Sequence, residues 1–547
     1  MARARGQKNE MTMTSIGVLY ELAATQPKKV AFIKDEEIWT YDRLAAAVDH
    51  LAFGLVERGL RKGDRIALHM ANLPEFVVAY HACFRTGVIA APLNIRLKTA
   101  ELIPLLQRLK PTLYIGQAAL YNEVASIDSS ILAANSRFVV DGPVNDRRVQ
   151  GWTSLFADVN GEPLQRTLDV DVPAVLLTTS GTTGRPKFVI HTLATLLKIA
   201  ESYEHLDLDG DQVSALGMPM VHASGLFTML AFVRFGVPFV LCERFDPDAL
   251  LDAIERHRCT WLLGLPFMFT TLLQRQRAHP RNIDSLRTCL SAGDVCPAQV
   301  QEQFPSVFGI PLRSFWAATE ALGSLTYGLE SGPVTRIVKG AQVRLVGVDK
   351  MPVSPGQVGE LVVRGPHVTI GYWAGPGLIE GAPEGGWFHT GDLMRQDEKG
   401  NLWFVSRKKH LIIRGGSNIS PVEVERVLMT HPAVRDAAVI GVPDPELGER
   451  VAGFVQLADG AQSADPNEIL AYVTGQLADY KVPESLQILH QIPRNATGKI
   501  DRQLLLKPRT DCSITDSDCG FGTNTSLIAP NFSTFPRRPT GNTHAKL

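Results

Sequence analysis

A stretch rich in glycine and hydroxyl residues, 176–187, carries the groups that a phosphate-binding loop needs. Glycines let backbone N–H groups turn toward an anion, and serine and threonine hydroxyls add further donors. Lys187, at the end of the stretch, adds a positive charge for the same anion. The chemistry expected here is the binding of phosphates by Thr179, Ser180, Gly181, Thr182, Thr183, Gly184 and Lys187.

This loop differs from a Walker A loop. Lys187 follows Pro186 and precedes Phe188, whereas a Walker A lysine is followed by serine or threonine. Residues 188–190 are also typical of a strand rather than a helix. The alternative interpretation is an ordinary surface loop. The length of the stretch, the apolar run before it and its terminal lysine favour phosphate binding.

The elements that must position this loop alternate between helical and strand patterns. Apolar residues recur at helical spacing over 44–55, a strand pattern follows at 66–70, and Pro74 can begin the next helix. Residues 88–91 and 237–241 are typical of buried strands. Such alternation predicts an α/β fold with mixed, mainly parallel sheets covered by helices.

The residue composition and pattern of the sequence change near residue 406. A short charged run, an apolar triplet and a pair of glycines precede Ser420, which has the form of a helix cap before Pro421. We expect a large N-terminal domain over 1–406, a hinge at 407–409 and a small, mobile α+β domain over 410–507. Residues 508–547 are rich in Ser, Thr, Asn, Gly and Pro, which predicts a disordered tail.

The composition excludes several classes of partner. The chain has 547 residues, with 55 Lys plus Arg against 56 Asp plus Glu. Its net charge therefore gives no reason to expect nucleic acid as a partner. No uncharged run is long enough to span a bilayer. The seven cysteines contain no Cys-x-x-Cys pair, which favours reduced thiols and a cytoplasmic location. The final tripeptide 545–547 is similar to the Ser-Lys-Leu address, so a peroxisomal location is the alternative in a eukaryote.

The 176–187 string closely resembles the phosphate loop of the adenylate-forming superfamily. This superfamily comprises acyl- and aryl-CoA synthetases, nonribosomal peptide synthetase adenylation domains and luciferases. The resemblance extends over roughly residues 15–507. It implies an enzyme that uses ATP and Mg²⁺ to convert a carboxylic acid into its acyl-AMP, and coenzyme A as the acyl acceptor.

A second motif, Trp316-Ala-Ala-Thr-Glu320, is similar to the superfamily's Tyr-Gly-x-Thr-Glu. The resemblance implies that Trp316 stacks on adenine, Thr319 contacts the α-phosphate and Glu320 holds Mg²⁺, a cation that prefers oxygen ligands. Phe315, just before the motif, joins the nucleotide-binding candidates. Ala317 stands where relatives have glycine at the edge of the acyl pocket, so a slightly shallower pocket is expected.

Two further motifs imply ribose contacts and a hinge. Asp392 ends a Thr-Gly-Asp sequence that is similar to a signature of the superfamily, and the resemblance implies that it accepts hydrogen bonds from both ribose hydroxyls. The run 406–410 resembles the superfamily's hinge, in which Arg407 reaches the ribose and Lys409 is the pivot. Ser406 and His410 depart from the usual glycine and aspartate there.

The remaining candidates concern the acyl and thiol groups. Lys499, in the string Thr-Gly-Lys-Ile, looks like the superfamily's catalytic lysine and would bridge the carboxylate and the α-phosphate. His222 lies in a stretch similar to the motif that lines the acyl site. Gly415 and Gly416 would lie beside the thiol of coenzyme A.

Three functions remain open at this point. The first is an acid–CoA ligase for a small-molecule carboxylic acid, with a medium-chain fatty or aryl acid favoured because Ala317 is small. The second is a stand-alone adenylation enzyme that loads a carrier-protein thiol. The third is a degenerate nucleotide-binding protein, since Phe188, Ala317 and His410 depart from the superfamily pattern. Neither nucleic acid nor an integral membrane segment is expected, and a homodimer is left open.

Overall fold

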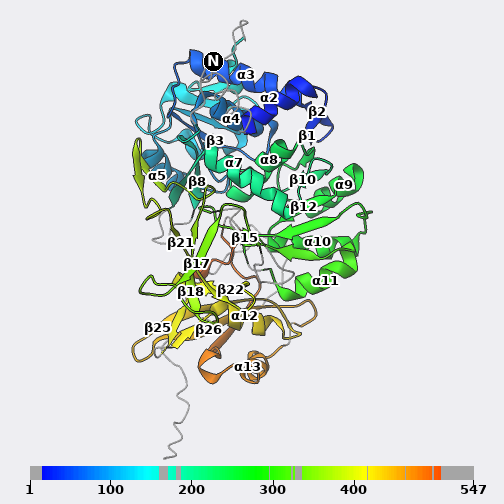
Figure 1. The fold of residues 1–547 in the computed structure, drawn as a ribbon, viewed down its shortest axis with the longest axis vertical. Helices are drawn as coiled ribbons and strands as arrows, with labels where there is room; N and C mark the ends of the chain where they lie inside the picture. Colours follow the sequence, from blue (N-terminus) through cyan, green and yellow to red (C-terminus); the bar gives the residue numbers. More distant parts are fainter. Residues whose placement is uncertain are drawn as a thin grey trace, which may run out of the picture. The chain divides into compact units, whose positions relative to one another are not determined.

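The computed structural model divides into two compact units between Leu411 and Ile412. The first unit contains two large sheets and a smaller one, and the second contains a sheet of its own (Figure 1). The structure describes residues 15–158, 170–179, 186–294, 296–321, 325–326, 336–414, 417–461, 464–495 and 498–506.

A nine-stranded sheet carries the start and end of the predicted phosphate loop. Its order is β20-β19-β9-β8-β4-β3-β5-β6-β7, parallel from β8 to β7 and antiparallel among β8, β9, β19 and β20. The strands are β3 (Arg65–His69), β4 (Ile89–Pro92), β5 (Leu113–Gly116), β6 (Arg137–Val139), β7 (Val149–Gly151), β8 (Pro173–Thr179), β9 (Lys187–Thr192), β19 (Tyr372–Gly375) and β20 (Leu378–Glu380).

A seven-stranded sheet forms the second half of this unit. Its order is β14-β13-β12-β10-β11-β1-β2, and only the β1–β2 pair is antiparallel. The strands are β1 (Val30–Lys34), β2 (Glu37–Thr40), β10 (Ser214–Leu216), β11 (Phe239–Leu241), β12 (Trp261–Gly264), β13 (Thr288–Ser291) and β14 (Leu312–Ser314).

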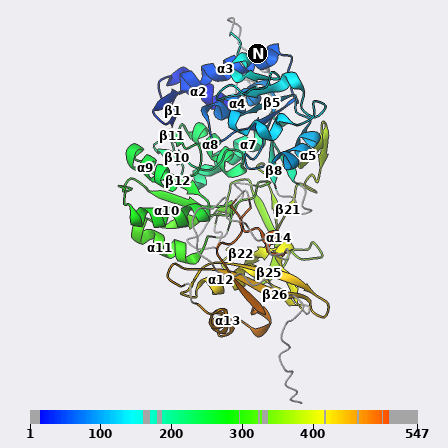
Figure 2. The ribbon, with the colours of Figure 1, turned by 180° about the vertical axis from the view of Figure 1, so that it is seen from behind.

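Four helices fill the space between these sheets: α3 (Tyr41–Glu57), α4 (Pro74–Thr86), α7 (Leu193–Glu201) and α8 (Ala223–Phe235). Helix α7 contacts β9, α8 contacts β10, and the two helices contact each other, so they connect the two sheets. Figures 1 and 2 both place α7 and α8 between β8 and β10. The other helices of the unit are α2 (Ser15–Thr25), α5 (Thr99–Leu109), α6 (Asn122–Ala125), α9 (Pro247–His257), α10 (Pro266–Ala278) and α11 (Ala298–Phe308).

These layers confirm the predicted fold class, and several predicted elements lie where expected. Helix α4 begins at Pro74, whose missing N–H and fixed φ suit the first turn of a helix. Leu44, Val48, Leu51 and Leu55 are buried on one face of α3. Residues 188–190 lie within strand β9, as predicted.

A four-stranded antiparallel sheet, which the sequence patterns did not predict, completes the first unit. Its order is β17-β18-β21-β22. The strands are β17 (Gln342–Val346), β18 (Val358–Arg364), β21 (Phe388–Gln396) and β22 (Leu402–Arg407), and a short pair, β15 (Leu325–Thr326) and β16 (Arg336–Ile337), precedes them.

The second unit, described by itself, is built on a five-stranded sheet in which β27 pairs with β26 beside the path β24-β23-β26-β25. Helix α12 begins after Ser420, whose side chain accepts a hydrogen bond from the N–H of Glu423, as the predicted cap requires. The elements are β23 (Ile412–Arg414), β24 (Ser417–Ile419), α12 (Pro421–Met429), β25 (Val434–Asp444), β26 (Gly448–Leu457), α13 (Pro466–Thr474), β27 (Ser485–Leu489) and α14 (Arg502–Leu506).

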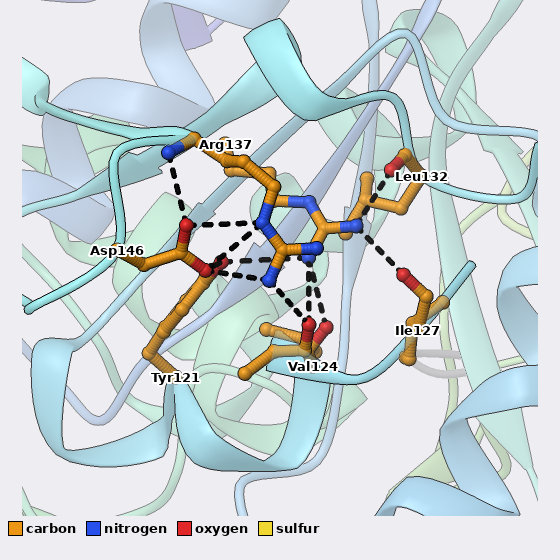
Figure 3. A network of polar contacts seen from close by, with 8 residues as sticks. Tyr121, Val124, Ile127, Leu132, Arg137 and Asp146 are labelled. Carbon is orange, nitrogen blue, oxygen red and sulfur yellow. Dashed lines mark hydrogen bonds and ion pairs between the residues drawn. The ribbon is translucent and has the colours of Figure 1, made fainter. Parts of the chain in front are cut away.

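A buried arginine organises the loop between β5 and β6 (Figure 3). The guanidinium of Arg137 donates to the hydroxyl of Tyr121, which in turn donates to Asp146 Oδ2 at 2.7 Å. It also donates to the backbone carbonyls of Val124, Ile127 and Leu132. Because most of these acceptors are backbone carbonyls, the network is structural. No helix in the described part of the chain is long and apolar enough to cross a membrane.

Candidate active site

Strands β8 and β9 form a hairpin that holds the two ends of the predicted phosphate loop. Thr179, the last residue of β8, is paired in register with Lys187, the first residue of β9. The Lys187 ammonium lies 4.7 Å from the centroid of the Tyr372 ring. Five predicted members of the loop lie outside the described residues: Ser180, Gly181, Thr182, Thr183 and Gly184.

The segment after β14 contains the Trp-Ala-Ala-Thr-Glu motif. Phe315 is buried and its N–H donates to the carbonyl of Ser291 on the neighbouring strand β13 at 3.0 Å. Trp316 is half-buried, and its indole Nε1 donates to Asp392 Oδ2 at 2.7 Å. The structure therefore brings together two motifs that are 76 residues apart in the sequence.

His191 on β9 fixes the backbone of this motif, and the sequence analysis did not identify it. Its Nε2 lies 2.8 Å from the carbonyl oxygen of Thr319. Because a carbonyl oxygen only accepts, Nε2 carries the proton. Burial lowers the pKa of His191 to about 4, so the imidazole is neutral near pH 7. The signal that could have found it is a histidine four residues after Lys187 on the same strand.

Glu320 is held at both its backbone and its side chain. The Glu320 carbonyl accepts from the N–H of Thr369 at 2.7 Å, and its Oε1 accepts from the hydroxyl of Tyr372 at 3.1 Å. Within the described ranges, no cluster of three or more His, Cys, Asp or Glu side chains could enclose a metal. A single carboxylate fits Mg²⁺, which keeps most of its ligands as water and substrate phosphates.

The buried carboxylate of Asp392 pairs with the partly exposed guanidinium of Arg407 at the predicted ribose position. They are directly opposite each other on β21 and β22, and Asp392 Oδ1 lies 2.8 Å from Arg407 Nε. The Asp392 side chain is only 2% exposed, and its Oδ1 has no well-aligned hydrogen bond. A carboxylate oxygen can accept more than one hydrogen bond, so Oδ1 can accept one from a ribose hydroxyl beside the arginine. Gly391, with φ +72°, lies at a register shift within β21, next to the residue that carries the carboxylate.

The predicted acyl-site residues lie at the start of α8 and in the segment after β14. His222 occupies the N-cap position of α8, and its Nε2 lies 3.5 Å from Asn94 Nδ2. Ala317 is half-buried against the main hydrophobic core of the first unit. Phe227, on the first turns of α8, packs its ring edge-on to His191 at 5.3 Å. An apolar helix thus begins at His222.

The second unit contains the predicted catalytic lysine. Lys499 lies in a tight turn in which the Asn495 N–H donates to the Lys499 carbonyl at 2.8 Å. Gly498 takes φ +81°, a left-handed conformation that glycine adopts without strain. Gly415 and Gly416 lie outside the described residues, between the paired Arg414 and Ser417. Lys409 lies in a single 3₁₀ turn, Lys408–His410, next to the unit boundary.

Comparison with known protein families identifies both parts of the chain. The profile of the AMP-binding enzyme family matches residues 19–373, and that of the AMP-binding enzyme C-terminal domain matches residues 423–499. The first match alone spans more than half of the 547 residues. The chain belongs to the AMP-binding enzyme family.

Curated relatives share most of the length of the chain. The medium-chain fatty-acid–CoA ligase of Escherichia coli K12 is 32% identical over 89% of this chain and 89% of its own. The feruloyl-CoA synthase of an Amycolatopsis species is 34% identical over 84% of this chain and 92% of its own. The 2-succinylbenzoate–CoA ligase of Bacillus pumilus is 31% identical over 89% of this chain and 96% of its own.

Solved structures share the fold. The o-succinylbenzoate CoA synthetase of Bacillus subtilis, in complex with its acyl-adenylate intermediate, superposes with a TM-score of 0.76 at 28% identity. The match covers 90% of this chain and 98% of that one. ATP-bound MatB of Rhodopseudomonas palustris gives a TM-score of 0.79 at 27% identity over 90% and 98% of the two chains.

These findings confirm the enzyme class that the sequence motifs predicted. The chain is an AMP-forming acyl-CoA synthetase that uses ATP, Mg²⁺ and coenzyme A. The roles of individual residues remain predictions, which the geometry of each unit supports to different degrees.

Proposed function

We propose that this enzyme activates a medium-chain fatty or aryl carboxylic acid as its acyl-AMP and then transfers the acyl group to coenzyme A. The single observation that carries the residue assignments is the convergence of five separate segments in the first unit. Lys187, Glu320 and Tyr372 are linked by direct contacts, and Trp316 contacts Asp392, which pairs with Arg407.

In the first step, a carboxylate oxygen of the acid attacks the α-phosphorus of ATP. The bond from this phosphorus to the oxygen bridging to the β-phosphate breaks, and pyrophosphate leaves. In this proposal Lys187 binds the phosphates, Thr319 contacts the α-phosphate, and Asp392 with Arg407 holds the ribose. Glu320 would hold Mg²⁺, which when bound neutralises charge on the phosphates and orients them.

Lys499 supplies the positive charge that this first step needs. The carboxylate and the triphosphate repel each other, so a cation positioned at the developing charge lowers the barrier. A hydrogen bond from the Asn495 N–H to the Lys499 carbonyl supports a fixed backbone at this lysine in the second unit. The proposal requires that the second unit place Lys499 at the α-phosphate during adenylation.

In the second step, the thiolate sulfur of coenzyme A attacks the acyl carbon of the acyl-AMP. The acyl carbon–oxygen bond breaks, AMP leaves with that oxygen, and the thiol proton is released. We assign Lys409 as the pivot of a rotation between the two steps. Gly415 and Gly416 are assigned to the path of the thiol.

The proposed acid follows from the small side chain at position 317 and the apolar helix after His222. The small side chain of Ala317 leaves room beside the carboxylate of the bound acid. Of the first nine residues of α8, all except Ser224 are buried. The stretch 219–225 contains no aspartate to pair the ammonium of an α-amino acid. Relatives of this chain that act on a medium-chain fatty acid and on ferulate support the same range of acids.

The location and assembly stay predictions. The described cysteines form no disulfide and are mostly buried, which is consistent with the predicted cytoplasmic location. The tripeptide 545–547 lies outside the described residues. Light scattering on the purified protein would decide whether it forms a homodimer.

The test is a pyrophosphate-release assay with ATP, Mg²⁺ and coenzyme A across acids of even chain length from acetate to palmitate, aryl acids and dicarboxylic acids. We expect the highest kcat/KM for a medium-chain or aryl acid, with the acyl-CoA as product. A best substrate among acetate, palmitate or the dicarboxylic acids would contradict the proposed acid class. Release of acyl-AMP with no acyl-CoA would instead contradict the second step.

A further inference from the structure

Tyr372 lies between the two charged groups that the proposed function assigns to the triphosphate and to Mg²⁺. It is the first residue of β19 and is half-buried. It packs against the main core of the first unit and also against the core of the small antiparallel sheet. Its ring face is 4.7 Å from the Lys187 ammonium, and its hydroxyl is 3.1 Å from Glu320 Oε1.

The backbone around Tyr372 fixes the ring. Tyr372 pairs with Val189 on β9 and with Glu380 on β20, so strands flank it on both sides. Gly381 has φ +59°, and a Cβ built at that position would lie 3.0 Å from Tyr372 Cδ2. A glycine is therefore required where the chain passes the ring, and this close approach limits movement of the ring.

The hydroxyl of Tyr372 acts as a donor. Burial, and after it the neighbouring Glu320 charge, raises the pKa of Tyr372 well above its usual value. A carboxylate can only accept, so the proton points to Glu320.

The cation on the ring face and the carboxylate at the hydroxyl are therefore held by one rigid side chain. A lysine over an aromatic face is stabilised by the ring quadrupole, and a hydrogen bond to an ionised group is stronger than a neutral one. The separation of the two charged groups then depends on the length of the tyrosine side chain.

We propose that Tyr372 is a positioning residue that sets Glu320 and Lys187 at the spacing required by Mg²⁺ and the phosphates of one ATP. The proposal rests on the proposed function, because it takes the roles of Glu320 and Lys187 from there. The hydroxyl holds the Glu320 carboxylate by a hydrogen bond, and the ring holds the Lys187 ammonium over its face.

Two substitutions separate these tasks, with ATP binding measured by isothermal titration calorimetry in Mg²⁺ and in EDTA. Tyr372→Phe removes only the hydroxyl, so the gain in ATP affinity that Mg²⁺ confers should fall about tenfold, while affinity in EDTA stays unchanged. Tyr372→Leu removes the ring as well, so affinity in EDTA should also fall, by roughly threefold.

Matched controls keep the result interpretable. Tyr121→Phe removes the hydroxyl of a buried tyrosine that also donates to a carboxylate, Asp146, at 2.7 Å in the same unit, and it should leave both affinities unchanged. Combining Glu320→Gln with Tyr372→Phe should give no further loss beyond Glu320→Gln alone, because the two residues act on one ligand.

The outcomes separate the inference from the proposed function. If Glu320→Gln removes the Mg²⁺-dependent gain but Tyr372→Phe leaves it intact or increases it, the positioning role is wrong and the proposed function stands. If Glu320→Gln itself leaves the gain intact, Glu320 is not the metal ligand, and both the assignment and the inference are overturned.

Discussion

Replacing Asp392 with asparagine tests the ribose site. The substitution keeps the shape of the side chain but removes its charge. Asp392 is 2% exposed and makes two contacts, with Trp316 Nε1 at 2.7 Å and Arg407 Nε at 2.8 Å. Because the Arg407 side chain is 36% exposed, water can compensate part of the lost ion pair, so the expected cost to folding is only about 1 kcal/mol.

The larger effect is expected on ATP affinity. Hydrogen bonds to an ionised acceptor contribute about 1.5–3 kcal/mol each, and bonds to a neutral acceptor about 0.5–1.5 kcal/mol. If two ribose hydroxyls donate to Asp392, the amide keeps one neutral acceptor and loses about 2 kcal/mol in total. That loss corresponds to roughly a 30-fold weaker Kd for ATP.

The assay compares ATP with 2′,3′-dideoxy-ATP in binding to the parent enzyme and to Asp392→Asn. The parent should prefer ATP strongly, and the variant should lose about 30-fold of that preference because its ribose contact is impaired. Asp146→Asn is the control. Asp146 also pairs with an arginine, Arg148, and accepts a hydrogen bond from a tyrosine, Tyr121, but it lies in the structural network of Figure 3. An unchanged preference for ATP in Asp392→Asn would refute the ribose assignment.

Two further predictions concern catalysis and acid stability. Lys499→Ala should slow adenylation on the order of 10² or more, measured as pyrophosphate release, while conversion of preformed acyl-AMP to acyl-CoA persists; equal losses in both would contradict the assignment. Burial lowers the pKa of His81 to about 4, below the roughly 6.5 of an unfolded chain, so its contribution to stability is present above pH 6.5 and is lost as pH falls toward 4. His81→Leu should therefore reduce the drop in unfolding free energy between pH 7 and pH 4.5 by about 2 kcal/mol, and denaturant curves that drop equally in both proteins would contradict this.

Local signals predicted many elements of the fold. Proline at the first turn marks the starts of α4 and α12, and apolar spacing identified the buried face of α3. Strand β9 was also predicted, because Phe188 and its two apolar successors lack any helix signal. Such signals arise between residues that are close together in the sequence, so they can be identified from one sequence alone.

Long-range pairing was harder to predict. The four-stranded sheet of β17, β18, β21 and β22 was missed because no helix separates its strands, so they follow no βαβ alternation. His191 and Tyr372 were given no role because their partners are 128 and 52 residues away in the sequence. Motif resemblance indicated Asp392 and Trp316 separately, but nothing in either motif predicts that the indole donates to the carboxylate.

The central claim is that the carboxylate oxygen of the acid becomes bonded to the α-phosphorus of ATP. It is tested most directly by turnover of an acid labelled with ¹⁸O in its carboxyl group, in the presence of ATP, Mg²⁺ and coenzyme A, followed by mass spectrometry of the products. The account predicts that each AMP formed carries one ¹⁸O atom and that the pyrophosphate carries none. Unlabelled AMP, or the label in inorganic phosphate together with ADP, would contradict it.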